Sequence, residues 1–276
     1  MPRDALVQFP AFRHHEASRE SANNAMMALL VGAQVSANFL ELTRDSSRQL
    51  SEIFPTIPHV ERFDLRPDAA QAILRGAEEH LGAMAVPQAL AIHEGFILDC
   101  LELIGARSAK AWQMHDKLAT RAGSSFDVDR MTRFHVLREM RNAIIHRSGI
   151  VSQPLVDKIG ELTPAGEVAW CKHTGRSPRG LQLGDRVTFM LGELVEALAT
   201  TKALAREANW MLIPAVPPAT WAKVIVEDHL QHTPGRLNPT KRRKVILGFV
   251  RHHYRAVAVT EADLKTAFAA CGIAMA

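Results

Sequence analysis

Apolar residues recur every three or four positions along most of the chain, a period that predicts amphipathic helices. We expect helices over about residues 21–49, 67–84, 87–104, 109–118, 127–147, 186–212, 219–230, 238–257 and 260–270. Prolines and glycines interrupt this period between residues 150 and 184. There, residues 166–173 and 181–183 are expected to form short strands or extended loop. The pattern therefore predicts an all-α fold: a helical bundle with a small irregular or short-strand insertion and a small helical domain at the C-terminus.

The same pattern suggests three segments. Residues 1–23 mix apolar and polar positions without a clear period and are expected to form an N-terminal arm. Residues 24–212 are expected to form the helical bundle. The proline-rich stretch Ile213–Pro218 is the best candidate for a domain boundary. Residues 219–276 then form a separate C-terminal helical domain.

Composition places the chain among globular proteins. It has 276 residues, of which 47% are apolar and 22% charged, enough for a substantial core. No apolar run reaches the roughly 18 residues of a membrane span, and the N-terminus lacks the layout of a secretory signal. The three widely spaced cysteines imply no disulfide framework. We expect a cytoplasmic protein that does not enter a membrane.

The net charge of +4 is concentrated at the C-terminus. From residue 214 onward, nine Lys and Arg face four Asp and Glu, whereas the rest carries 24 against 25. On the helix expected over 238–257, four cations align opposite the core positions: Lys241, Lys244, Arg251 and Arg255. This stripe is a candidate surface for phosphate contacts, and a solvated basic face is the alternative.

One helix concentrates the polar groups that can do chemistry. On the segment expected over 127–147, one sector roughly 160° wide holds six polar side chains: His135, Arg138, Glu139, Arg141, Asn142 and His146. Phe134 and Ile145 point into the same sector, where exposure of their apolar side chains to water would be unfavourable. We therefore expect a partner to cover this face, and a two-fold dimer would do so.

The sequence Arg141-Asn142-x-x-x-His146, followed by Gly149-Ile-Val and by a long closing helix, resembles the HEPN superfamily (higher eukaryotes and prokaryotes nucleotide-binding domain). The resemblance covers about residues 87–212, and 24–86 would extend the bundle. Two other Arg-x4-His matches occur, at Arg75 and Arg130, but they lack the Arg-Asn pair. The resemblance implies a metal-independent endoribonuclease that acts in host defence, toxin–antitoxin systems or RNA processing, with a composite site formed by two copies.

Under that resemblance, His146 is the acid–base candidate because histidine titrates near neutral pH. Arg141 would hold phosphate oxygens, and Asn142 would hold a ribose or phosphate oxygen or orient a histidine of the other copy. Arg138 and His135 would extend the phosphate contacts, together with the basic stripe, or would serve only as polar groups of the helix surface. Glu139 would be an intrahelical salt-bridge partner or part of the site. No metal or cofactor is expected: there is no Walker or Gly-x-Gly-x-x-Gly loop, and Cys171-x-His173 is too little for a zinc site.

The partners expected are RNA and a second copy of the chain, with an antitoxin or a defence-system partner as a further option. Two other classes of function remain open. One is a non-catalytic HEPN binding or scaffold module, in which the same residues bind but RNA stays intact. The other is a nucleic-acid-binding regulator, in which residues 219–276 dock on DNA and the bundle dimerises; those residues show no recognition-helix signature.

Overall fold

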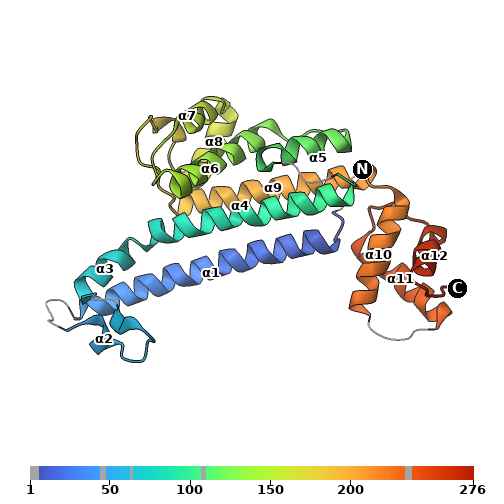
Figure 1. Ribbon diagram of the computed structural model, residues 1–276, viewed down its shortest axis with the longest axis horizontal. Coiled ribbons are helices and arrows are strands. Elements are labelled where there is room, and N and C mark those ends of the chain that lie inside the picture. The colour runs from blue at the N-terminus through green and yellow to red at the C-terminus, as the bar shows by residue number, and fades with distance from the viewer. Residues whose placement is uncertain (1–5, 44–47, 63–64, 107–109, 234–237) are drawn as a thin grey trace. The chain divides into compact units, whose positions relative to one another are not determined.

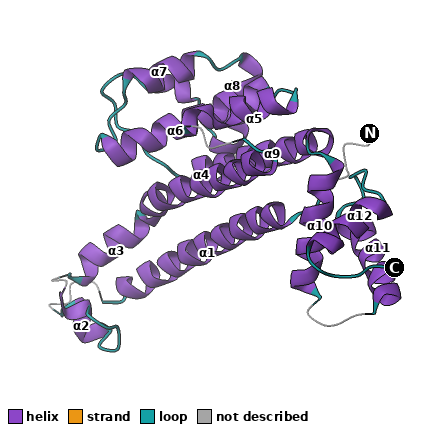
Figure 2. Cartoon of the chain, turned by 45° about the vertical axis from the view of Figure 1, so that its right-hand side comes forward, coloured by secondary structure: helices purple, strands orange, loops and turns teal. Residues whose placement is uncertain are grey.

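The computed structural model describes residues 6–43, 48–62, 65–106, 110–233 and 238–276 (Figure 1). The described residues form only helices, turns and loops, which confirms the all-α prediction (Figure 2). The α-helices are α1 Pro10–Glu41, α2 Leu50–Ile53, α3 Pro67–Arg75, α4 Ala77–Leu103, α5 Met114–Ala122, α6 Val128–His146, α7 Gln153–Gly160, α8 Pro164–Thr174, α9 Leu191–Ala215, α10 Pro218–His232, α11 Pro239–His253 and α12 Glu261–Ala270.

The chain divides into two compact units that interleave in sequence. Unit 1 consists of residues 1–18, 90–131 and 199–276, and unit 2 of residues 19–89 and 132–198. Helices α1, α4, α6 and α9 each contribute to both units. This division does not follow the boundary drawn at residues 213–218, because the second half of α9 and the C-terminal helices belong to the same unit.

Unit 1 is held by a cluster of aromatic rings and one buried carboxylate. Phe9 lies between Phe96, at 6.1 Å between ring centroids, and Trp221, at 5.7 Å. Asp228 is buried on α10 and accepts hydrogen bonds from Arg13 on α1, at 2.6 Å, and from the hydroxyl of Tyr254, also at 2.6 Å. These contacts fix the start of α1 against α10 and the end of α11, which lie together with α12 in Figure 1.

Unit 2 packs α6, α8 and α9 around buried apolar side chains that include Phe134, Leu137 and Trp170. Gly192, at the start of α9, allows a close approach to α8: a Cβ there would lie 2.7 Å from the Cα of Thr174 at the end of α8. Any larger residue would push the two helices apart. This contact sets the distance between the polar groups that α8 and α9 present to each other.

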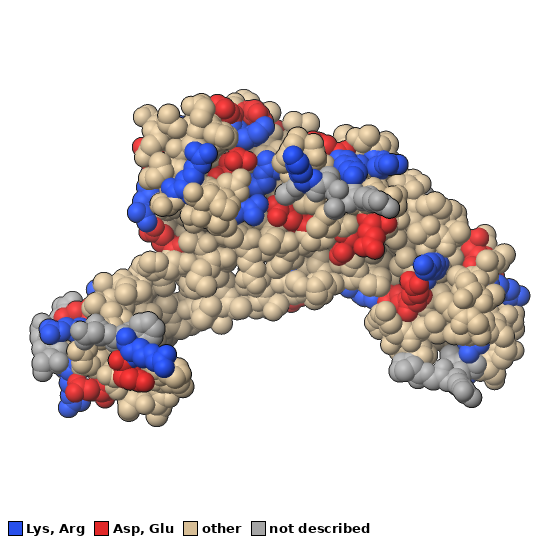
Figure 3. Space-filling view, viewed as in Figure 1, with Lys and Arg blue, Asp and Glu red and all other residues tan. Residues whose placement is uncertain are grey.

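Helix α1 corrects the expected N-terminal arm. Residues 10–23, assigned to an arm, belong to the single helix Pro10–Glu41, and Phe12 and His15 on it are buried. No Asp, Glu, Lys or Arg occurs between Glu20 and Glu41, and the middle of the lower edge in Figure 3 is largely uncharged. Val31 and Val35 are each 62% exposed on this stretch. Such a surface favours contact with apolar groups rather than with a polyanion.

Three other expectations about helix bounds are wrong. Pro87 lies inside α4 instead of starting it. Residues 166–173, expected as a short strand, lie in α8, whose Thr163 side chain caps the first turn by accepting from the amide of Gly166. Helix α9 begins at Leu191 rather than Arg186, because Val187 donates its amide to Gly149 at 2.7 Å and extends the backbone there.

Helix α4 is relevant to the prediction that the protein does not enter a membrane. Among the described residues it is the one helix that is long and apolar enough to cross a membrane. Core helices of soluble proteins share these two properties, and the side chains of Leu90, Ile97 and Leu101 on α4 are buried inside the protein. At least these three apolar side chains of α4 pack in the core, and cytoplasmic location stays a prediction.

Candidate functional site

Helix α6 carries the candidate site, and both of its ends are fixed. At the start, the Asp127 side chain accepts a hydrogen bond from the amide of Arg130 at 2.9 Å, as expected for a helix cap. At the end, Gly149 takes a φ of 81° and donates its amide to the carbonyl of Ala143 at 2.9 Å. His146 is the last helical residue, so the expected position in the last turn is confirmed.

The two apolar residues expected to face a partner behave differently. Phe134 is fully buried inside unit 2, so its role as an interface residue is wrong. The first half of α6 is covered on more than one side, since Thr132, Arg133 and Leu137 are buried as well. Ile145 is 52% exposed, next to His146. Only the second half of the polar sector therefore has an apolar residue available for a partner.

A carboxylate links two of the predicted site residues. Glu139 accepts a hydrogen bond from Arg138 Nη2 at 3.3 Å and one from Asn142 Nδ2 at 3.3 Å. Arg138 is nearly buried, and its Nη1 has no hydrogen-bond partner in the described part of the chain. Glu139 thus neutralises much of the charge that Arg138 was expected to offer to phosphate, and it orients the amide of Asn142.

His135 lies on the same helix, half-buried near the cations Arg138 and Lys158. Burial is the main cause that lowers its pKa from 6.5 to about 4, and Arg138 and Lys158 lower the pKa further. The imidazole is therefore uncharged at neutral pH. It can give or take a hydrogen bond, but it does not bring the positive charge that phosphate contact would require of it.

His146 and Arg141 remain accessible at the end of the helix. His146 is exposed, and Arg141 is half-buried. Asn142 lies one helical turn before His146, so their side chains are on neighbouring positions of one face. The end of α6 thus presents an imidazole, an amide and a guanidinium within about one and a half turns of helix.

A polar cluster that the sequence did not reveal lies at the middle of unit 2. The carboxylate of Glu196 on α9 is fully buried and pairs with Arg133 on α6 at 2.6 Å and with His173 Nδ1 on α8 at 2.6 Å. His173 was considered only as a zinc ligand, and Glu196 was not a candidate. The available signal was a glutamate on the apolar face of a long helix, where a carboxylate needs partners.

The predicted basic stripe is only partly formed. Lys241, Lys244 and Arg251 are exposed on α11, and the side chain of Asn238 caps this helix by accepting from the amide of Lys241 at 2.8 Å. Helix α11 ends at His253, so Arg255 lies outside it and is not aligned with the other three. The aligned cations therefore number three rather than four.

Comparison with known protein families, with curated proteins and with solved structures found no match to this chain.

Proposed function

We propose that the chain is a metal-independent endoribonuclease of HEPN type, as a toxin or phage-defence effector would be, with Arg141, Asn142 and His146 in its active site. The observation that carries this proposal is the exposed imidazole of His146 at the end of α6, one turn beyond an amide that a carboxylate orients. The resemblance of Arg-Asn-x-x-x-His to the HEPN motif supplies the reaction class.

The chemistry requires only groups of this kind. The 2′-oxygen of a ribose attacks the adjacent phosphorus while a base takes its proton, and the bond from phosphorus to the 5′-oxygen breaks as an acid protonates that oxygen. The products are a 2′,3′-cyclic phosphate and a 5′-hydroxyl. His146 would transfer protons, Arg141 would stabilise the charged phosphorane, and Asn142 would hold an oxygen of the substrate.

A second copy would complete the site. One α6 offers one exposed histidine at its end, whereas proton removal and proton donation are easier with two. A two-fold axis near Ile145 would cover that exposed side chain and bring a second His146 close. Of the two apolar residues expected at the dimer interface, only Ile145 is available, since Phe134 belongs to the core.

The alternative is a module that binds RNA without cleaving it. The observation that favours it is the use of Glu139 to hold Arg138 and Asn142, which leaves fewer groups ready for a phosphorane. The two functions differ in one measurement, because only the nuclease changes the length of the RNA.

The test is incubation of the purified protein with single-stranded RNA in EDTA. We expect cleavage to products with 5′-hydroxyl and 2′,3′-cyclic phosphate ends. His146→Ala should lower the rate about 10²- to 10⁴-fold without changing the melting temperature, because the side chain is exposed. His252→Ala, which removes an exposed histidine from α11, is the matched control.

Loss of activity in EDTA, or full activity of His146→Ala, would contradict the proposal. RNA that is bound but stays intact would instead support the binding module. Mixing Arg141→Ala with His146→Ala subunits tests the composite site, because a mixed dimer that shares its sites holds one complete set of residues. Light scattering on the wild type should then report a dimer.

A further inference from the structure

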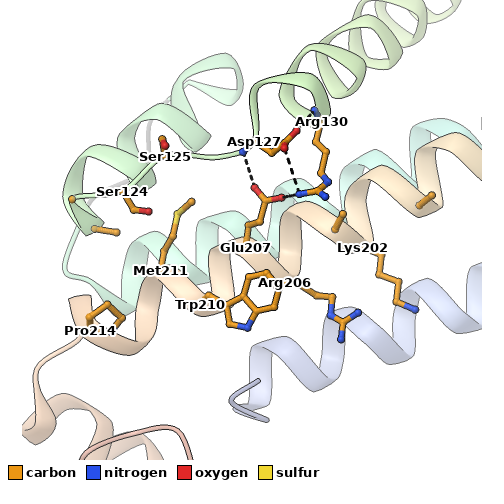
Figure 4. A pocket seen from close by; sticks show the side chains of 14 residues that line it. Ser124, Ser125, Asp127, Arg130, Lys202, Arg206, Glu207, Trp210, Met211 and Pro214 are labelled. Atoms are coloured by element: carbon orange, nitrogen blue, oxygen red, sulfur yellow. Dashed lines mark hydrogen bonds and ion pairs between the residues drawn. The ribbon is translucent and has the colours of Figure 1, made fainter. Parts of the chain in front are cut away.

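Unit 1 contains a cavity of about 790 Å³ between α9 and the loop that precedes α6 (Figure 4). This volume lies within the range of small-molecule sites. The residues that line it are Ala122, Gly123, Ser124, Ser125, Asp127, Arg130, Ala199, Lys202, Ala203, Arg206, Glu207, Trp210, Met211 and Pro214. All of them belong to unit 1, so the cavity is formed within one compact unit.

The cavity exists because α9 has small side chains in the middle of this face. Ala199 and Ala203 are one turn apart and form part of the cavity wall. Lys202, Arg206 and Trp210 follow each other at intervals of four residues, and Figure 4 shows them in a row along α9. An indole ring and two cations therefore stand beside the space that the alanines leave.

The charges of the cavity are not equally available. Glu207 accepts hydrogen bonds from Arg130 and, at 2.9 Å, from the amide of Asp127, and Asp127 also lies 3.8 Å from Arg130. These two carboxylates neutralise Arg130. Within the described chain, neither Lys202 nor Arg206 takes part in such a pair, and Arg206 Nε and Trp210 Nε1 are buried without hydrogen-bond partners. Positive charge is thus left on the side of the cavity that holds the indole.

This combination selects a ligand with a flat ring and a phosphate. A tryptophan face stacks on a nucleobase of any kind, and an arginine fork and a lysine bind phosphate oxygens. The spacing along α9 puts the two cations about one and two helical turns from the indole, at roughly 5.4 Å a turn. Ser124 and Ser125 lie across the cavity from the indole, beyond Met211 in Figure 4, and line its far side.

We propose that this cavity binds a nucleotide unit, with its base on Trp210 and its phosphate between Lys202 and Arg206. The unit has two sources, a free mononucleotide or one nucleotide of single-stranded RNA. The proposal does not rest on RNA cleavage. Arg141 and His146 belong to unit 2, and binding can be measured with ligands that cannot be cleaved.

The test is titration calorimetry with adenosine monophosphate, with inorganic phosphate, and with a 2′-O-methylated hexanucleotide that has no free 2′-hydroxyl to attack. We expect Trp210→Leu and the double variant Lys202→Gln/Arg206→Gln each to weaken binding by at least about tenfold. Ala203→Leu, which keeps helix propensity but fills the space, should abolish binding. Lys265→Gln, an exposed cation of α12 outside the cavity, should leave binding unchanged. Unchanged melting temperatures would show that the variants fold.

Binding of the mononucleotide assigns the site to free nucleotides, and binding of the hexanucleotide alone, with the same sensitivity to the variants, assigns it to RNA. Either result supports the proposal. It is overturned if neither ligand binds, if inorganic phosphate binds as tightly as the nucleotide, or if the Trp210 and Lys202/Arg206 variants bind like the wild type. Because these experiments measure binding and not cleavage, their outcomes can be interpreted even if the nuclease proposal is wrong.

Discussion

Two Arg–Glu ion pairs join α6 to α9, and they differ in exposure. At the start of α6, Arg130 pairs with Glu207, and the arginine side chain is 40% exposed. One turn further along α6, in unit 2, Arg133 pairs with Glu196, and the two side chains are 10% and 0% exposed. The first pair borders an open cavity. The second is enclosed and includes His173, 2.6 Å from the other oxygen of Glu196.

The difference shows that the effect of an Arg–Glu pair on stability depends on its burial and not only on its residue types. Buried charges are costly unless each is paired, so the Glu196 cluster has a specific structural task in holding α6, α8 and α9 together. A solvated pair contributes little to stability. Its effect in unit 1 is local: Arg130 is occupied, and Lys202 and Arg206 remain to give the cavity its positive side.

The largest expected effect follows from this contrast. Glu196→Ala removes one partner of a buried cluster and deprives Arg133 of its carboxylate, so it should lower the free energy of unfolding by about 3–5 kcal/mol. Glu207→Ala, at the exposed pair, should cost about 1 kcal/mol. Urea denaturation of both variants measures the two losses. Equal losses would mean that burial does not separate the two pairs.

The two histidines of α6 extend the contrast from pairs to single groups. Burial beside Arg138 and Lys158 gives His135 a pKa of about 4 in the folded protein, against 6.5 for an ordinary histidine, and Glu161 only partly opposes this. The unfolded chain therefore binds more protons than the folded one below about pH 6.5. Stability that is present above this pH is lost as the pH falls toward 4.

We expect this one group to cost about 2 kcal/mol of stability at pH 4, allowing for its partial exposure. His135→Gln should remove this acid-induced loss of stability. The free energy of unfolding of the variant relative to the wild type should therefore rise as the pH falls from 6.5 to 4. Urea unfolding at a series of pH values measures it. His146→Gln, at the exposed end of the helix, is the control, and an equal effect of both substitutions would refute the assignment.

The sequence predicted what depends on neighbours along the chain. The helix expected over residues 127–147 is found at Val128–His146, because its ends depend on local signals: the cap at Asp127 and the positive φ of Gly149. The prediction failed where tertiary contacts decide. Phe134 was placed on an exposed face because one helix viewed alone does not show what covers it. Pro164 was among the prolines interpreted as interruptions of the helical period, although it is the first residue of α8.

The candidate sites also differ in whether their residues are close together in the sequence. Arg141, Asn142 and His146 are close in sequence, so a motif was enough to bring them together. All residues that line the unit 1 cavity come from two segments, residues 122–130 and 199–214, that are far apart in the chain. The Glu196 cluster joins residues of three helices. No periodicity within one segment can show that such residues meet, and only the packing of α6 on α9 does so.

The smallest expected effect concerns α11, where paired and exposed cations lie on one helix. All three cations are exposed, but Arg243 pairs with Glu261 at 2.7 Å, whereas in the described part of the chain Lys241 and Lys244 take part in no ion pair. If RNA runs over α11, Lys241→Gln/Lys244→Gln should raise the Michaelis constant for RNA about 3- to 10-fold and reduce the slope of the salt dependence by about 0.7 for each phosphate that the variant no longer neutralises. Arg243→Gln should change the salt dependence little, because its charge is already matched. Steady-state cleavage at several salt concentrations measures both. Turnover that collapses at saturating RNA in the double variant would instead place these lysines in the chemical step, since weakened capture is overcome by more substrate and weakened catalysis is not.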